Sequence, residues 1–97
     1  EFVEQSWDIP PAYWHNRYCC VVHGVGLVDE YPALAHKGSD WASSGYDGVF
    51  EENMVLCVES YIGEQGGKEG IKLEQQVLIT ANGCEALSHY PWQTDWL

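Results

Sequence analysis

The sequence predicts an α+β fold built mainly on an antiparallel sheet, and two β-rich runs carry that prediction. Residues 54–61 and 71–80 are rich in apolar and β-branched side chains, and a polar, glycine-rich turn separates them. Residues 18–23 form a third, shorter run of this kind. A chain of 97 residues has room for one small domain at most.

The first part of the chain predicts little regular structure outside that short strand. We expect residues 1–8 to be the last turns of a helix, which Pro10 and Pro11 end because proline cannot continue it. An irregular aromatic segment follows at residues 12–17, before the strand.

The long segment 28–50 lacks a regular pattern, apart from a helical turn expected near residues 32–35. A loop of that length is usually functional or disordered, and its aromatic residues favour an ordered loop. After the hairpin we expect a turn at residues 81–83 and a brief return to strand or turn at 84–87. The remaining residues form a tail that packs by its aromatic side chains.

Charge and cysteine content limit the classes of partner and compartment. The net charge is −11 with only 4 basic residues, which argues against nucleic acid or an anionic membrane as partner. No signal peptide or membrane span is visible.

None of the 4 cysteines forms a C-x-x-C pair, so we expect buried free thiols and a cytoplasmic location, although a disulfide stays open. The chain begins without Met, so we expect a fragment of a longer protein.

The predicted hairpin places two acids opposite each other. If it folds symmetrically about Gly66 and Gly67, then Glu59 faces Glu74 with Cβ atoms about 4.5–5.5 Å apart, where like charges are destabilising. A shared proton, a basic neighbour or a bound cation relieves such a pair. Lys72 shares the face of Glu74, and we expect it to neutralise one acid without filling a site between both. In the alternative, a slipped register leaves both acids in solvent.

His23 completes a candidate metal-ligand set. It ends the short strand, where a lone histidine is more often a satisfied core residue, yet neutral imidazole is also the commonest metal ligand. Together with Glu59 and Glu74 it offers nitrogen and oxygen ligands that suit Zn, Mn or Fe(II) better than Ca. Three ligands hold one ion, whereas a two-metal site needs further carboxylates.

Four short motifs give the chain a family resemblance. They are HGVGL at 23–27, ENMVLCVE at 52–59, GIKLEQQVLIT at 70–80 and GCEALS at 83–88. In this order they resemble the C-terminal catalytic half of the pita-bread metalloenzymes, the creatinase and aminopeptidase superfamily. The resemblance implies that residues 1–97 are a single partial domain, the C-terminal part of a pita-bread domain whose upstream half is absent.

The same resemblance implies a ligand set and its incompleteness. His23 and Glu59 would be terminal ligands, and Glu74 would bridge two divalent ions, with Fe, Mn or Zn as candidates. The family's two other ligands are aspartates found well upstream, and this chain shows no such motif. We therefore expect the isolated chain to be inactive and to self-associate through the sheet surface or edge that the upstream half would cover.

Within that superfamily the chain departs from the Xaa-Pro peptidases. Glu30 stands where they carry a second histidine, and Ser60 and Tyr61 stand where they usually have Pro-Gly. The segment instead resembles the dimethylsulfoniopropionate lyase branch, in which Asp29 would be the general base and Tyr18 would line the substrate pocket.

The substrate prediction also rests on the aromatic residues. Aromatic rings can hold a sulfonium cation by cation–π contact, although ordinary packing is the simpler explanation for them. The candidates are Tyr31, Trp41 and Tyr46. Two alternatives stay open: a metallopeptidase that acts on short Xaa-Pro peptides, and a non-catalytic binding fragment whose hairpin acids are structural.

Overall fold

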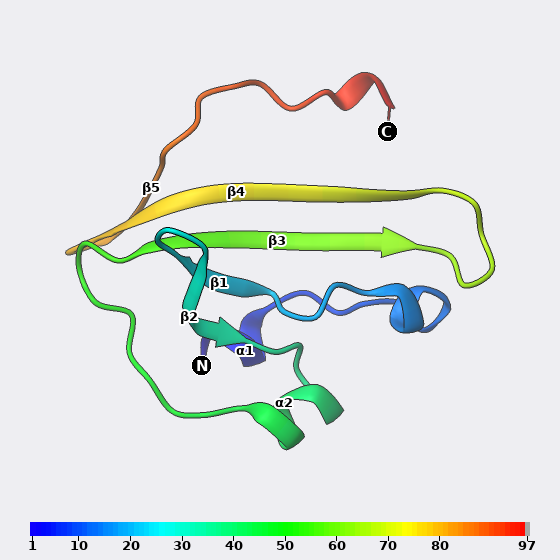
Figure 1. Cartoon of the computed structure of the whole chain (residues 1–97), viewed down its shortest axis with the longest axis horizontal. Helices are drawn as coiled ribbons and strands as arrows, with labels where there is room; N and C mark the ends of the chain where they lie inside the picture. The colour runs from blue at the N-terminus through cyan, green and yellow to red at the C-terminus, as the bar shows by residue number, and fades with distance from the viewer. Residues whose placement is uncertain (97) are drawn as a thin grey trace.

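The computed structural model describes residues 1–96, which fold around one antiparallel sheet (Figure 1). Within that range the sheet has five strands in the order β2-β1-β3-β4-β5, and every neighbouring pair is antiparallel. The strands are β1 (Val22–Val25), β2 (Asp29–Leu34), β3 (Val55–Gly63), β4 (Gly70–Thr80) and β5 (Gly83–Ala86). The predicted α+β class with a dominant antiparallel sheet is confirmed, and the arrangement is consistent with part of a pita-bread domain.

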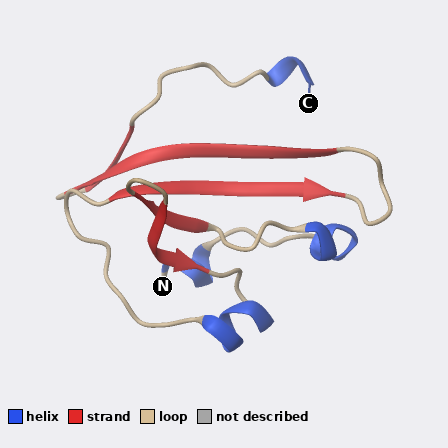
Figure 2. Cartoon of the chain, in the orientation of Figure 1, coloured by secondary structure: helices blue, strands red, loops and turns tan. Residues whose placement is uncertain are grey.

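The helices are short and lie outside the sheet (Figure 2). They are α1 (Phe2–Gln5), η1 (Pro11–Asn16), α2 (Ser39–Ser44) and η2 (Thr94–Trp96). The helix expected over residues 1–8 shrinks to one turn, after which Ser6 Oγ donates a hydrogen bond to the Val3 carbonyl at 2.7 Å. Pro11 begins a 3₁₀ helix where the sequence predicted an irregular segment, because proline suits a first helical position.

The central hairpin has the register that symmetry about its glycines predicts. Strands β3 and β4 pair from Val55 opposite Leu78 to Gly63 opposite Gly70, with Glu59 opposite Glu74. Gly66 adopts a positive φ of 77°, which glycine reaches without steric cost, so the turn closes there. The slipped register is therefore wrong.

The segment before the hairpin differs from the prediction. The first strand begins at Val22 rather than at residue 18, and residues 32–35 belong largely to strand β2 instead of a helical turn. Strand β2 tolerates Pro32 because it lies at the edge of the sheet, beside a register shift between His23 and Gly24. A Cβ at Gly24 would overlap the Tyr31 carbonyl, so this glycine permits the close backbone approach that the sequence suggested.

The core lies where α1 and strands β1 to β3 meet. Its buried members are Val3, Val21, Val22, Leu34 and Leu56. Beyond β5 the chain returns alongside β4 (Figure 1). None of the helices in residues 1–96 is long and apolar enough to cross a membrane.

Candidate metal centre

Strands β1, β3 and β4 bring His23, Glu59 and Glu74 together on one face of the sheet. Glu59 lies in the middle of β3 and is only 1% exposed, and His23 is 7% exposed. His23 pairs with Cys57, two residues before Glu59, so both side chains point to the same face. The His23 Nε2 to Glu59 Oε1 distance is 3.1 Å. The imidazole and the two acids therefore meet at one place, as the sequence predicted.

Lys72 lies between the two carboxylates, which corrects the expectation that it would neutralise only one. Its Nζ is 2.6 Å from Glu59 Oε2 and 3.2 Å from Glu74 Oε2. The reason is geometric: Lys72 precedes Glu74 by two residues, so it stands diagonally across from Glu59 within reach of a long side chain. The close contact with the Glu59 carboxylate is the main cause that raises the pKa of Lys72.

Glu59 Oε2 is a buried oxygen without a well-oriented hydrogen bond. The Lys72 ammonium approaches it closely but at a poor angle, so the contact is an ion pair rather than a directed hydrogen bond. A buried carboxylate oxygen in this state is costly unless a positive group compensates it. At this position the Lys72 ammonium is that positive group.

Two buried thiols contact the same carboxylates, and the sequence argument did not anticipate them. Cys57 Sγ donates to Glu74 Oε1 at 3.0 Å, and Cys20 Sγ donates to Glu59 Oε1 at 3.7 Å. Burial raises the pKa of both thiols to about 12. The Cys57 hydrogen bond, in turn, is the main cause that lowers the pKa of Glu74. The available signal was spacing, since Cys57 stands two residues before Glu59 on one strand face.

The prediction of buried free thiols holds for two of the four cysteines. All four are free, but Cys19 and Cys84 are exposed, and only Cys20 and Cys57 are buried. Cys84 is exposed because β5 is a short edge strand whose residues are all open to solvent. Potential ligand atoms of His23, Cys57 and Glu74 all lie within 4.8 Å of one another.

The two predicted catalytic residues both lie beside this centre. Asp29 begins β2, its side chain is 75% exposed, and its Oδ1 is 3.7 Å from His23 Nδ1. Tyr18 is half-buried, and its ring centroid is 4.2 Å from the Lys72 ammonium. The negative charge of Glu59 is the main cause that raises the pKa of Tyr18.

The three aromatic residues predicted to bind substrate make packing contacts elsewhere. The rings of Tyr31 and Tyr46 meet edge to face at 6.3 Å, and the Tyr46 hydroxyl accepts a hydrogen bond from the Ala33 amide at 2.9 Å. Trp41 packs against the hydrophobic core. Among residues 1–96, no hydrogen bond, ion pair or ring contact joins them to Glu59 or Glu74. Their role in substrate binding stays a prediction.

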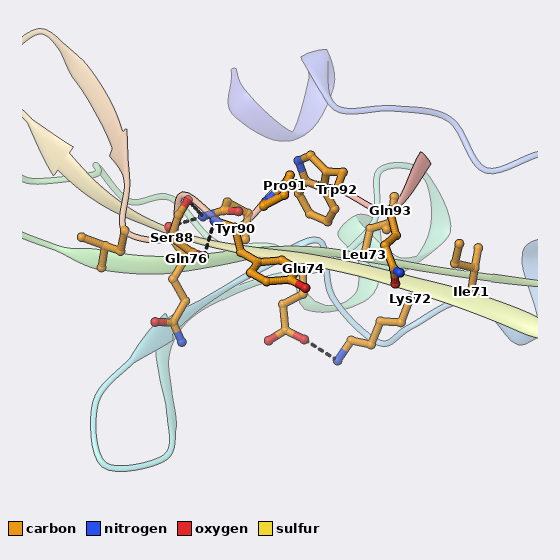
Figure 3. A pocket seen from close by; sticks show the side chains of 12 residues that line it. Ile71, Lys72, Leu73, Glu74, Gln76, Ser88, Tyr90, Pro91, Trp92 and Gln93 are labelled. Carbon is orange, nitrogen blue, oxygen red and sulfur yellow. Dashed lines mark hydrogen bonds and ion pairs between the residues drawn. The ribbon is translucent and has the colours of Figure 1, made fainter. Parts of the chain in front are cut away.

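A hollow of about 560 Å³ lies between β4 and the C-terminal tail. Figure 3 shows Pro91 and Trp92 on one side of β4, while the side chains of Lys72 and Glu74 project from the other. The strand alternation agrees, since Leu73 faces the tail. Lys72 and Glu74 are nevertheless among the residues that line this hollow, so it adjoins the strand that carries Glu74.

Comparison with known proteins places these motifs in a family. Residues 6–81 match metallopeptidase family M24. The chain is 46% identical over 93 residues to the dimethylsulfoniopropionate lyase DddP of Roseovarius nubinhibens, covering 95% of this chain and 20% of that protein. It is 52% identical over 78 residues to the DddP of Roseobacter denitrificans, covering 79% of this chain and 17% of that protein. The putative dipeptidase YkvY of Bacillus subtilis is 35% identical over 72 residues, covering 71% of this chain and 17% of that protein. The chain thus spans at most a fifth of the length of these relatives.

Proposed function

Because the chain belongs to metallopeptidase family M24, we propose that His23, Glu59 and Glu74 form part of a divalent-metal site in a dimethylsulfoniopropionate lyase. The convergence of these three side chains at the centre of the sheet is the observation that carries the proposal. The identity of 46–52% with two lyases supports the choice of reaction.

The residues present fit one or two ions of Fe, Mn or Zn. The set offers an imidazole nitrogen and carboxylate oxygens, which suit these metals, and the buried Glu59 Oε2 already lies 2.6 Å from a positive charge, the Lys72 ammonium. A bound ion would act as a Lewis acid toward the carboxylate of the substrate. Because this chain contributes three ligands, the proposal also requires ligands from an upstream part of the protein.

Asp29 is the proposed general base. Its exposed carboxylate, beside His23, is free to accept a proton from the carbon next to the substrate carboxylate. The electron pair of that C–H bond then forms a carbon–carbon double bond, and the C–S bond breaks. The sulfur keeps the bonding electrons and leaves as neutral dimethyl sulfide, so charge and atoms balance.

Tyr18 is the proposed binding residue for the sulfonium group. Its ring already lies 4.2 Å from one cation, the Lys72 ammonium, and this contact supports a role in cation–π binding. A sulfonium cation offers the same kind of charge without hydrogen-bond donors. Tyr31, Trp41 and Tyr46 join this proposal only if substrate binding rearranges the segment from β2 past α2 that carries them.

A peptidase acting on Xaa-Pro bonds is the second candidate. The family match and the 35% identity to a putative dipeptidase favour it. In that case Glu30, or a residue outside this chain, takes the part of the histidine that the peptidases carry. A third candidate is a non-catalytic fragment, which the bridging position of Lys72 favours because the ammonium already compensates the two acids.

Substrate assays on the whole protein separate these candidates. We expect dimethyl sulfide from dimethylsulfoniopropionate and no cleavage of Xaa-Pro peptides. Asp29→Asn should lower the lyase rate by about 10²–10⁴-fold, the usual contribution of a general base. Glu30→Gln should leave the lyase rate unchanged. Peptide cleavage without dimethyl sulfide would refute the lyase, and absence of tightly bound metal after dialysis would favour the third candidate.

Two further proposals concern partners and location. We propose that the isolated chain self-associates through the uncovered part of β4, which an upstream half would otherwise cover. We also propose a cytoplasmic location, since all four cysteines are free thiols, the state that a reducing compartment maintains.

A further inference from the structure

Glu59 and Glu74 have the same pattern of neighbours, and metal ligation alone does not require that pattern. Each carboxylate has one oxygen on a buried thiol and the other beside the Lys72 ammonium. The contact of Cys57 with Glu74 is the shorter at 3.0 Å, against 3.7 Å for Cys20 with Glu59. Cys57 is fully buried, so water does not compete for its thiol.

The strand register explains how Cys57 reaches Glu74. Cys57 pairs with His23 on one side and with Gln76 on the other, which places it diagonally across from Glu74. The thiol therefore meets Glu74 Oε1, while Lys72 holds Oε2 at 3.2 Å. Two contacts at opposite oxygens fix the rotation of this carboxylate, although 44% of its side chain is exposed.

The distance distinguishes a hydrogen bond from shared metal ligation. A sulfur at 2.3 Å and an oxygen at 2.0–2.2 Å from one tetrahedral ion would lie about 3.5 Å apart. The observed separation of 3.0 Å is shorter, and it joins the thiol as donor to a carboxylate oxygen as acceptor. In this arrangement Cys57 contacts Glu74 as a hydrogen-bond donor.

We propose that Cys57 is a positioning residue of the metal centre, whose thiol hydrogen bond to Glu74 Oε1 holds that carboxylate in its ligating orientation. This inference rests on the proposed metal site. Groups that orient metal ligands in this way typically contribute about 10–100-fold to metal affinity. Cys20 has the same relation to Glu59 at a longer distance, so its contribution should be smaller.

The test compares two variants of one shape in the whole protein. Cys57→Thr keeps a donor at this position, whereas Cys57→Val has nearly the same volume and none. Both are β-branched and suit the middle of β3, so any packing strain is common to both. We expect Mn²⁺ to bind Cys57→Val at least about 10-fold more weakly than Cys57→Thr, which should stay near the wild type. Cys84→Ala, an exposed cysteine on β5, is the control and should bind as the wild type does.

Each outcome separates the inference from the metal site itself. Equal Mn²⁺ affinity in Cys57→Thr and Cys57→Val would overturn the positioning role while leaving the metal site intact. A thiolate-to-metal absorption band in the Co²⁺-loaded wild type, absent from Cys57→Thr, would also overturn it, because Cys57 would then be a ligand. A wild-type protein that binds no Mn²⁺ or Co²⁺ would refute the metal site and the inference together.

Discussion

Removal of the Lys72 ammonium should destabilise the metal-free chain, because two opposed acids would lose the cation between them. The Cβ atoms of such a pair lie about 5 Å apart. Two unit charges at that distance repel by about 3 kcal/mol at an effective dielectric constant of 20. Breaking a fully buried ion pair costs about 3–5 kcal/mol. The Glu59 side chain is fully buried, but those of Lys72 and Glu74 are 38% and 44% exposed, so solvent reduces the effect. We expect Lys72→Met to cost about 2 kcal/mol.

Thermal unfolding in chelator measures this cost. A loss of about 2 kcal/mol lowers the midpoint by about 8–16 °C in a chain of this size. Lys68→Met, in the exposed turn of the hairpin, is the matched control and should change little. If a divalent ion can take the place of the ammonium, Mn²⁺ at 100 times its Kd should return about 2.7 kcal/mol to Lys72→Met.

A double-mutant cycle identifies the cause. Lys72→Met combined with Glu74→Gln leaves no like charge opposite Glu59, so it should recover part of the loss seen in Lys72→Met alone. A midpoint for Lys72→Met that equals the Lys68→Met midpoint would refute the reasoning, since the acids would then need no cation.

Three further outcomes follow from the structure. The Cys57 hydrogen bond lowers the pKa of Glu74 below its ordinary value of 4.5. The ionised Glu74 therefore contributes its full stabilisation above pH 4.5, and this stabilisation is lost as the pH falls through the lowered pKa. Acid unfolding curves of wild type and Glu74→Gln should therefore diverge above pH 4.5 and converge at lower pH. Burial lowers the pKa of His36, whose Nε2 contacts the Tyr18 carbonyl. The free energy of unfolding should therefore fall as the pH drops below 6.5, because the unfolded chain binds a proton there more readily. Urea titrations should show a smaller fall in His36→Gln than in the wild type. Leu73→Lys, on the exposed part of β4, should shift the chain toward monomer in light scattering, and a monomeric wild type would contradict self-association.

The hairpin register was predictable because its information is local. Two glycines fix the turn, and alternation along β3 and β4 then determines which residues face each other. The position of His23 followed less directly, since it needed β1 to pair with β3 rather than with another strand. Ligand chemistry and the motif resemblance, and not the spacing, connected it with the acids.

Strand β2 was not predictable from its residues. Pro32 and the exposed acids Asp29 and Glu30 are poor strand formers, and the chain adopts a strand there because β1 supplies a partner. Pairing with a remote segment outweighed local propensity. The same long-range pairing places Asp29 opposite Val25, near His23, a contact that no local pattern indicates.

Lys72 shows the limit of reasoning from strand alternation alone. Alternation correctly placed it on the face of Glu74, but it does not describe how far a side chain reaches. The four-carbon stem of lysine spans the diagonal to Glu59, so one ammonium contacts both acids. The repulsion that suggested a metal site is therefore already compensated in part within the chain. A divalent ion must consequently bind more favourably than an ammonium that is covalently attached to the same hairpin. That competition makes the response of Lys72→Met to Mn²⁺ more decisive for the metal site than the meeting of the acids alone.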